Sequence, residues 1–507
     1  MKKIDIKNIG GGGEEFNKDL TLKLVFSAVP AVFGVVFLWN FWHKGIYALG
    51  FNATVFLFLL LGVFVWVLYK KGRYTNQDLF WIIPLVLIAF SYSIYDNPFL
   101  KMAGLPILPV MFMIFYNQAF LTDKKNAPWD RDFIFKIINR FFSFLPRLGR
   151  SGALYLSLVI PAGNAKKRVA VRALAGIILF LIIALAVFIP LLSSADPVFA
   201  DKMEFIYDWL EIISLPLVYR ILTAMGSTIL FFSALTAWSK RFDHTGEKEE
   251  SKNIDSVVSG IVLGGILCLY LLFLWVQISR LWVGDLPFDF KETENLVKSG
   301  FWQLILLSII NILIYFSTYK RTIAVVQKIL AAFTVASLFL LISAGYRMGL
   351  YVTYYGFSYE KFFASYTVIY CSILLIWLVS RLFAEKRANI LKFVLFLFLW
   401  MYAIVTVFPV EQFILRTNVA LKNNIEESRI RLFELTMLSP DVLPLVKEYK
   451  QQGLLKESTG YLAREKEVKS EKQFDWEPWI EQQEKTISDK VWYEKNLMNV
   501  VYVYRNK

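Results

Sequence analysis

The sequence is poor in the side chains that build metal and nucleophile sites. It has two histidines, His43 and His244, in separate loops with several apolar runs between them. They cannot form a zinc cluster, and neither has the neighbours that a histidine-based catalytic triad needs. The two cysteines, Cys268 and Cys371, lie inside apolar runs, which argues against a disulfide framework or a thiolate metal site. We therefore expect no catalytic residue, no metal and no cofactor.

Charged residues are also scarce. They make up 19% of the chain, against about 25% in a typical soluble protein, and 57% of the residues are apolar, with a mean hydropathy of +0.50. The excess lies in runs long enough to cross a ~30 Å hydrocarbon core as helices. These runs cover about 22–42, 46–69, 79–95, 99–121, 169–192, 214–238, 257–278, 300–318, 323–345, 362–383 and 388–408. We predict an all-α fold: a polytopic helical membrane bundle of about 11 transmembrane helices, with interfacial amphipathic helices and a small, mostly helical C-terminal tail domain.

Lysine and arginine are concentrated in alternate loops. The rich loops are the N-terminal segment, 70–78, 122–168, 239–256, 319–322 and 381–387. By the positive-inside rule they face the cytoplasm, so the N-terminus is cytoplasmic and eleven crossings place the C-terminus outside. The net charge of +14 belongs to the membrane part, because the tail 409–507 has equal numbers of basic and acidic residues. This charge is a topology signal, and we expect no nucleic-acid binding.

The chain divides into five predicted segments. They are a cytoplasmic arm (1–21), a first transmembrane group of four helices (22–121), a cytoplasmic segment (122–168), a second transmembrane group of seven helices (169–408) and an extramembrane domain (409–507). In the last of these, we expect a helix between an N-cap at Ser439 and a C-cap at Gly453, and another from about 474. The final run "NVVYVYR" alternates as a strand does.

Residues 131–150, "RDFIFKIINRFFSFLPRLGR", form a predicted amphipathic helix. Its apolar side chains fall on one side, and its basic face consists of Lys136, Arg140, Arg147 and Arg150. Such a helix lies in the headgroup plane, where cations meet anionic lipid headgroups on the cytoplasmic side. The alternative is that it packs against the protein's own helices. Pro146 should bend its last turn.

Residues 193–216 form a second predicted amphipathic helix, on the outer side. Asp196 followed by Pro197 is typical of an N-cap and a first turn. Four acidic residues, of which Asp201 is the first, form one face of the helix. This stripe either faces water or binds a cation or a protein partner.

The stretch "SAGYRMGLYVTYYGFSYEKFFASY", residues 343–366, joins two apolar runs and holds six tyrosines. It is either an aromatic belt at the outer interface or a structured site. By the predicted topology it shares the outer side with the acidic helix and Arg220. We expect Arg347 or Arg220 to pair with Asp196 or another outer acid.

Several short strings resemble a bacterial family of polytopic membrane proteins, domain of unknown function 4173, which is close to 4153. The strings are "SADPVF", "YRMGLYVTYYGFSYEK" and "LSPDVLP". The matching positions are Ser194 to Phe199, Tyr346, Arg347, Tyr355, Gly356, Asn418, Leu438 to Pro444, Trp476 and Trp479. The resemblance covers roughly residues 170–480. It implies a multi-pass protein of the bacterial cytoplasmic membrane and no established activity.

Three function classes follow. The first is a non-catalytic envelope sensor, binding or assembly protein acting at the outer face, with a possible protein partner there. The second is a transporter or flippase of an uncharged or amphiphilic substrate, for which the double-proline run 99–121 is the best candidate for a broken helix. Asn311 lies near mid-depth, but a single asparagine there is typical of helix–helix glue and does not support this class. The third is a membrane enzyme on a lipid-linked substrate, which a pocket with two convergent carboxylates would favour. The candidate outer-face residues are Asp196, Asp201, Arg220, Tyr346, Arg347, Tyr355, Gly356 and Asn418.

Overall fold

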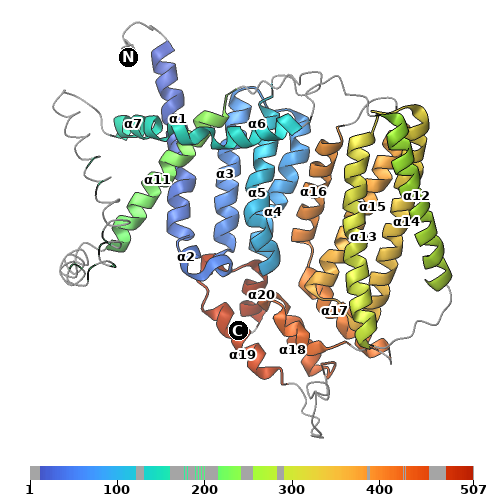
Figure 1. The fold of residues 1–507 in the computed structure, drawn as a ribbon. Helices are drawn as coiled ribbons and strands as arrows, with labels where there is room; N and C mark the ends of the chain where they lie inside the picture. Colours follow the sequence, from blue (N-terminus) through green and yellow to red (C-terminus); the bar gives the residue numbers. More distant parts are fainter. Residues whose placement is uncertain are drawn as a thin grey trace. The chain divides into compact units, whose positions relative to one another are not determined.

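The computed structural model of the chain describes residues 12–121, 129, 131–159, scattered single positions between 160 and 214, 215–240, 255–281, 290–384, 389–425, 428, 430–455 and 475–505. Within these ranges every element is a helix (Figure 1). Nine of them are long and apolar enough to cross a membrane. They are α1 (Gly12–Phe37), α3 (Phe51–Lys70), α4 (Leu79–Ile94), α5 (Pro98–Ala119), α11 (Leu215–Trp238), α12 (Ser256–Leu281), α14 (Ala324–Tyr355), α15 (Tyr359–Leu382) and α16 (Ile390–Val407).

These helices confirm a multi-pass, all-helical protein. A further helix, α13 (Phe290–Thr318), contains a shorter apolar stretch at Trp302–Thr318. Together these helices account for ten of the eleven predicted runs. The run at 169–192 and the acidic helix after it lie outside the described residues, so the count of about eleven stays a prediction.

The remaining helices are short. Before α11 they are α2 (Phe41–Lys44), η1 (Gly45–Ala48), η2 (Asn76–Asp78), α6 (Arg131–Phe141), η3 (Phe142–Arg147) and α7 (Leu148–Val159). After α16 they are α17 (Val410–Asn424), η5 (Leu432–Met437), η6 (Pro440–Val442), α18 (Leu443–Gln451), α19 (Glu477–Ser488), η7 (Trp492–Glu494) and α20 (Leu497–Arg505). The predicted amphipathic helix 131–150 is thus three pieces, with Pro146 in the 3-10 piece.

The contacts divide the chain into two units that alternate along the sequence. Unit 1 comprises residues 1–78, 113–124 and 135–243, and unit 2 comprises 79–112, 125–134 and 244–507. The predicted groups 22–121 and 169–408 followed sequence order instead and remain predictions of domain organisation.

Unit 1 is held together at the end where α3 and α11 finish. Lys70 forms a salt bridge of 3.0 Å with Asp19 of α1, and Lys71 donates to the Ser239 carbonyl at 2.8 Å. The buried ring of Phe64 stacks on Trp238, with centroids 5.7 Å apart. The basic residues at the end of α3 therefore lie beside the N-terminal part of α1 and the end of α11.

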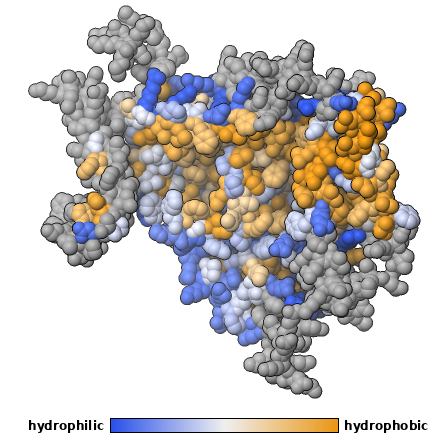
Figure 2. All heavy atoms as spheres, in the orientation of Figure 1, coloured by the Kyte–Doolittle hydropathy of each residue, from blue (hydrophilic) through white to orange (hydrophobic). Residues whose placement is uncertain are grey.

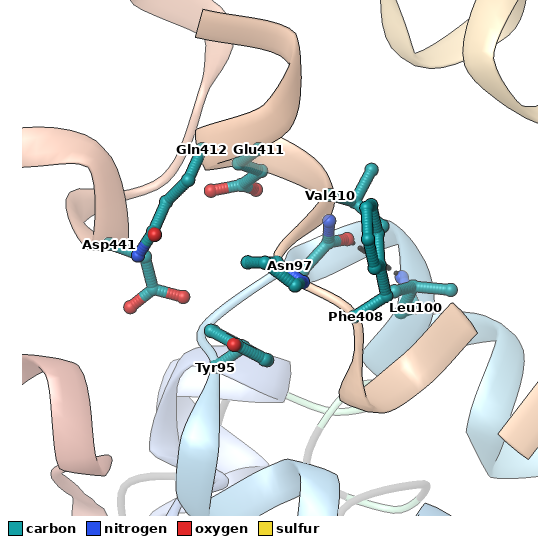
Figure 3. Close-up of a pocket in the computed structure, with 9 residues that line it drawn as sticks. Tyr95, Asn97, Leu100, Phe408, Val410, Glu411, Gln412 and Asp441 are labelled. Atoms are coloured by element: carbon teal, nitrogen blue, oxygen red, sulfur yellow. Dashed lines mark hydrogen bonds between the residues drawn. The ribbon is translucent and has the colours of Figure 1, made fainter. Parts of the chain in front are cut away.

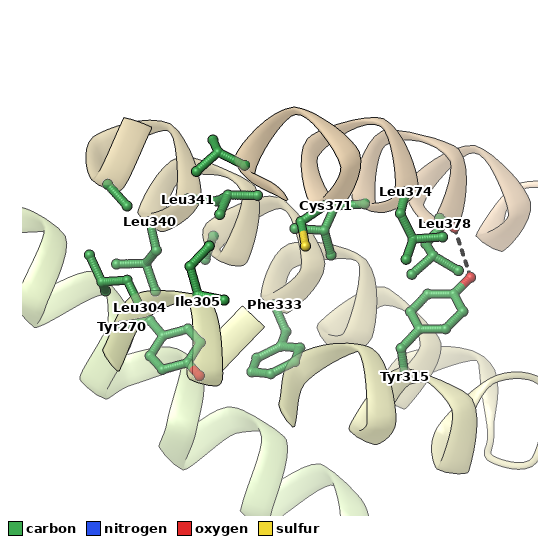
Figure 4. Close-up of a cluster of buried hydrophobic side chains, with 14 of the residues drawn as sticks. Tyr270, Leu304, Ile305, Tyr315, Phe333, Leu340, Leu341, Cys371, Leu374 and Leu378 are labelled. Atoms are coloured by element: carbon green, nitrogen blue, oxygen red, sulfur yellow. Dashed lines mark hydrogen bonds between the residues drawn. The ribbon is translucent and has the colours of Figure 1, made fainter. Parts of the chain in front are cut away.

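Unit 2 has an apolar core between α12, α13, α14 and α15. Phe333 stacks on Tyr270 with centroids 5.4 Å apart, and Leu341, Leu374 and Leu378 pack in the same cluster (Figure 4). A polar chain also crosses this core: the Tyr270 hydroxyl donates to Asn311 Oδ1 at 2.7 Å, and Asn311 Nδ2 donates to Ser337 Oγ at 2.9 Å. Asn311 joins three helices, as predicted for helix–helix glue.

The double-proline helix α5 is continuous through Pro106 and Pro109, so the broken helix that we considered at this run is wrong. Two tyrosines bond its first turn: Tyr402 Oη donates to the Leu100 carbonyl at 2.8 Å, and Tyr92 Oη donates to that of Lys101 at 3.2 Å. Gly104 permits this approach, because a Cβ there would lie 2.6 Å from Tyr92 Oη. These bonds hold the start of α5 against α4 and α16.

The two ends of unit 2 differ in charge and composition. At one end, Lys320 in the α13–α14 turn donates to the Ala384 carbonyl just after α15, so two basic corners lie together. At the other end lie the α4–α5 corner, the start of α17 and the tail helices. Figure 2 shows hydrophobic atoms over α12–α14 and mainly hydrophilic atoms over the tail.

The tail elements in the described ranges are helical. Ser439 caps η6, which leads directly into α18, and Gly453, with φ +71°, follows the last residues of α18. Lys447 and Glu484 form a salt bridge, and Tyr502 lies within 2.5 Å of both, which ties α18, α19 and α20 together. The predicted strand at the final run is wrong, because it forms α20, capped by Asn496 Oδ1 accepting from the Asn499 N–H at 2.7 Å.

Candidate functional site

The α4–α5 corner contains the sequence Asp96-Asn97-Pro98. Asn97 Oδ1 accepts from the Leu100 N–H at 3.0 Å, and Pro98 occupies the first helical position, so this dipeptide starts α5. Asp96 is thereby fixed just outside the two spans. Its side chain is almost completely buried, at 1% exposed.

Asp96 forms a salt bridge with a lysine on each of its two oxygens. Lys101, one turn into α5, lies 2.6 Å from Oδ1, and Lys490 contacts Oδ2 from the C-terminal segment, by which we mean residues 490–505. Lys490 Nζ also lies 3.4 Å from Asn499 Oδ1. Both lysine side chains are buried, at 5% and 4% exposed. We call these three charged residues the junction triad.

A second carboxylate extends the junction triad towards the tail. Asp441, in η6, accepts from the Asp96 backbone N–H and from Asn496 Nδ2 at 3.0 Å. Asn496 is the residue that caps α20. The α4–α5 corner, η6 and α20 are therefore joined through buried polar groups.

A third carboxylate belongs to α17. Glu411 lies in the first turn of that helix, and its oxygens accept from the hydroxyls of Tyr359 and Ser439 and from the Ser439 N–H at 3.1 Å. Three donors therefore converge on this carboxylate, and Glu411 is 4% exposed. Ser439 connects it to η6, where Asp441 follows two residues later.

The electrostatic environment separates the three acids. Burial raises the pKa of Glu411 to about 8, with the charge of Asp441 contributing, and burial together with the charge of Asp96 raises the pKa of Asp441 to about 7. Burial also acts to raise the pKa of Asp96, but Lys101 and Lys490 outweigh it and hold that pKa below its usual value. Only Asp96 among these three forms a salt bridge in the described part of the chain.

A small recess connects this cluster to its surroundings. Figure 3 shows Glu411, Asp441, Asn97 and Tyr95 around it. Its other lining residues are Leu100, Phe408, Pro409, Val410 and Gln412. Its empty space of about 240 Å³, mouth included, is below the ~300–1,000 Å³ of pockets for drug-sized ligands. Across the described ranges no three His, Cys, Asp or Glu side chains are placed to hold a metal ion.

Three predicted outer-face residues meet at the corner between α14 and α15. Asn418 of α17 accepts from the Phe357 N–H at 2.6 Å and donates to the Phe357 carbonyl at 2.8 Å. Gly356 has φ +67°, and a Cβ there would lie 2.7 Å from Asn418 Oδ1, so glycine is required twice over. Lys361 Nζ donates to the carbonyls of Tyr355 and Gly356. We call this the Asn418 clamp; it fixes backbone.

The other predicted outer-face residues do not join this clamp. Arg220, in unit 1, lies over the Trp39 ring at 5.3 Å, and neither it nor Arg347 forms a salt bridge within its unit's described residues. Tyr346 is exposed, as is Asp196. Asp201 lies outside the described residues. The pairing of Arg347 with Asp196 stays a prediction.

The predicted lipid face of residues 131–150 is divided. Arg140 donates to the carbonyls of Trp238 and Lys240, and the Trp238 indole donates back to the Arg140 carbonyl at 3.1 Å. Lys136 and Arg150 are exposed, while Arg147 is half-buried. Arg140 therefore contacts protein, and lipid contact of the face stays a prediction.

The sequence analysis missed Asp96, Lys101, Glu411, Asp441 and Lys490. Two signals pointed towards them: an Asp directly outside two apolar runs, and the "LSPDVLP" string, which contains Asp441. Neither signal identifies a partner, because the contacts cross 345 residues to Asp441 and 394 residues to Lys490.

Comparison with known proteins gives one family. No curated protein and no solved structure matches the chain. A family model, Domain of unknown function (DUF4153), matches residues 82–449, which is more than half of the 507 residues. This is the neighbour of the family that the short strings suggested, and the matched range includes the α4–α5 corner, α17 and η6. The chain belongs to the DUF4153 family of proteins of unknown function.

Proposed function

We propose that this protein is a non-catalytic sensor, binding or assembly protein of the bacterial cytoplasmic membrane. We place its working part at the tail-capped end of unit 2, the end where the tail packs on the α4–α5 corner. The N-terminus lies in the cytoplasm and the tail outside. The observation that carries the proposal is the junction triad. It buries one carboxylate and two ammonium groups where the tail meets the α4–α5 corner.

Buried charges are a poor means of stabilising a helix bundle. Their desolvation cost can exceed their mutual attraction, and apolar residues of similar volume often serve as well. The best-attested use of such groups is to fix one arrangement or to form a switch. The triad therefore supports a tail whose position on the bundle end matters to function.

The orientation is supported by the placement of basic corners. Lys320 and the end of α15 lie at the end of unit 2 opposite the junction triad. In unit 1, Lys70 and Lys71 gather where α1 and α11 have their polar ends. Each unit thus has one basic end, as the positive-inside rule expects of a cytoplasmic face.

Cysteine labelling tests this orientation. In a Cys268→Ser, Cys371→Ala background, a membrane-impermeant maleimide should label Ser488→Cys, on the tail, in intact cells. The matched control Arg321→Cys, in the α13–α14 turn, should react only after permeabilisation. The reverse pattern would place the tail in the cytoplasm and refute the outer-face function.

The recess favours an enzyme in one respect, since Glu411 and Asp441 both line it. Their geometry argues against catalysis, because each carboxylate already accepts from two or three protein donors. The recess is also smaller than a pocket for a lipid-linked substrate. Transport loses its main structural argument with the continuous α5. We therefore favour the sensor or binding function.

A further inference from the structure

We propose that Glu411 and Asp441 form a proton-binding site that couples docking of the C-terminal segment to the acidity of the medium. Docking takes up protons from the medium onto these carboxyls, and release of the segment returns them. This inference rests on the proposed function, because it makes the tail-capped end a sensor of outside pH.

The geometry places the two carboxyls where ionisation is costly. Both are buried, at 4% and 3% exposed, and neither forms a salt bridge within the part of the chain that the structure describes. The nearby cations, Lys101 and Lys490, are already engaged by Asp96. Ionisation of either carboxyl of the pair would therefore bury a negative charge that no cation of the described residues contacts directly.

All the elements around the pair contribute titratable or charged groups. The α4–α5 corner supplies Tyr95 and Asp96, α5 supplies Lys101, and α15 supplies Tyr359. The C-terminal segment supplies Lys490 and, fully buried, Glu494, which accepts from the Val491 N–H at 3.3 Å. With both members of the pair protonated, the junction triad carries one negative and two positive charges. Ionisation of Asp441 would balance the one excess positive charge of the triad. Ionisation of Glu411 as well would leave one excess negative charge.

The pair is also accessible to protons. Glu411 and Asp441 line the same recess, and Asn97 faces it with a buried Nδ2 that has no hydrogen-bond partner. The opening is too small for a drug-sized ligand, but proton exchange requires only water. Asp441, which accepts from Asn496 of the C-terminal segment, therefore lines the recess as well, and Glu411 lines it beside Asp441.

The sign of the pH effect follows from the raised pKa values. In the docked state, burial raises the pKa of Glu411 from 4.5 to about 8 and that of Asp441 from 3.8 to about 7. The docked state therefore binds more protons than the released state between about pH 4 and pH 8, and docking weakens as pH rises through that window. Asp96 acts in the opposite sense: its pKa is lowered, and its contribution is lost as pH falls below the usual value of 3.8. Docking is thus strongest in mildly acidic medium.

The test measures docking directly in the full chain. Spin labels at Ser93→Cys on α4 and Val501→Cys on α20, two helices in contact, report the distance between tail and bundle in lipid nanodiscs. The native cysteines are replaced as above. From pH 5 to pH 9 the docking equilibrium constant should fall by about 100-fold or more, the effect of one such carboxyl, and the short distance should give way to a broad distribution.

Two variants assign this effect to the pair. Glu411→Gln and Asp441→Asn cannot ionise, so each should keep the tail docked to higher pH than in the wild type. Glu481→Gln, an exposed acid on α19, is the matched control and should leave the profile unchanged. If either variant fails to fold, the pH dependence of the spin-label distance in the chain with Glu411 and Asp441 intact still tests the proposal.

A distance that stays short from pH 5 to pH 9 in the wild type, while Asp96→Asn lengthens it, would overturn the proton-binding site. It would still support the junction triad as the contact that holds the C-terminal segment on the bundle. A tail that stays docked in Asp96→Asn as well would refute the junction triad, and with it the proposed function.

Discussion

Two regions of unit 2 differ in how they are held together. The core between α12 and α15 consists of many apolar contacts, with the chain Tyr270–Asn311–Ser337 and the hydrogen bond from Tyr315 to the Leu378 carbonyl across it. The tail junction consists of a few buried charges on segments hundreds of residues apart. The core should tolerate single losses because its contacts are numerous, whereas the junction depends on each of its members.

The energetics of the two regions differ for the same reason. A hydrogen bond between membrane helices contributes about 0.6 kcal/mol on average, because the unfolded chain in the membrane also finds partners. A buried charge left without its partner costs about 3–5 kcal/mol. Substitutions at the junction should therefore have the larger effects, although it contains fewer residues.

The largest effect is expected at Asp96. Asp96→Asn leaves Lys101 and Lys490 buried without their carboxylate, and should reduce the opening free energy of the tail by about 3–5 kcal/mol. Amide hydrogen exchange of residues 490–505 in nanodiscs measures this free energy.

Asp475→Asn is the matched control, since Asp475 is exposed and an asparagine can still accept from the Glu477 N–H. Protection in Asp96→Asn equal to that in the control would show that the triad does not hold the tail.

An intermediate effect is expected at the Asn418 clamp. Asn418→Ala leaves the N–H and carbonyl of Phe357 without partners at the α14–α15 corner, which should cost about 1–3 kcal/mol. Gly356→Ala should be destabilising as well, through the positive φ and the contact with Asn418. Thermal unfolding in nanodiscs measures both, with Asn423→Ala, exposed on the same helix, as control. Equal melting of Asn418→Ala and the control would contradict the clamp.

The smallest effect is expected in the apolar core. Asn311→Leu removes the bonds to Tyr270 and Ser337, and should cost about 0.6–1.7 kcal/mol, the range measured for hydrogen bonds between membrane helices. The same unfolding assay applies, with Ser317→Ala as control, because the Ser317 hydroxyl bonds only within α13 in the described residues and lies on its exposed face. A loss as large as that of Asp96→Asn would erase the contrast between the two regions.

Much of the fold follows from the sequence because membrane helices are local objects. Apolar runs of sufficient length predict ten described helices, and the short family strings mark Gly356 and Asn418, which meet in the clamp. The broken helix at Pro106 and Pro109 was wrong, because α5 runs continuously through both prolines. The strand at the C-terminus was wrong because the cap at Asn496 and packing on α4 outweigh a Val/Tyr alternation.

The junction triad could not be predicted in the same way. Asp96 before Pro98 is typical of an ordinary helix start, and Lys490 of an exposed tail. Only the return of the chain to the α4–α5 corner brings them together. Buried ion pairs depend on tertiary structure, and no spacing in a single sequence announces them.

The most direct test of the account is a double-mutant cycle between Asp96 and Lys490. Asp96→Asn, Lys490→Met and the double variant are compared by hydrogen exchange of the tail at pH 6. We predict that the two substitutions together cost much less than the sum of their separate costs, because either one alone leaves a buried charge without its partner. Strictly additive costs would contradict the claim that this contact holds the tail on the bundle.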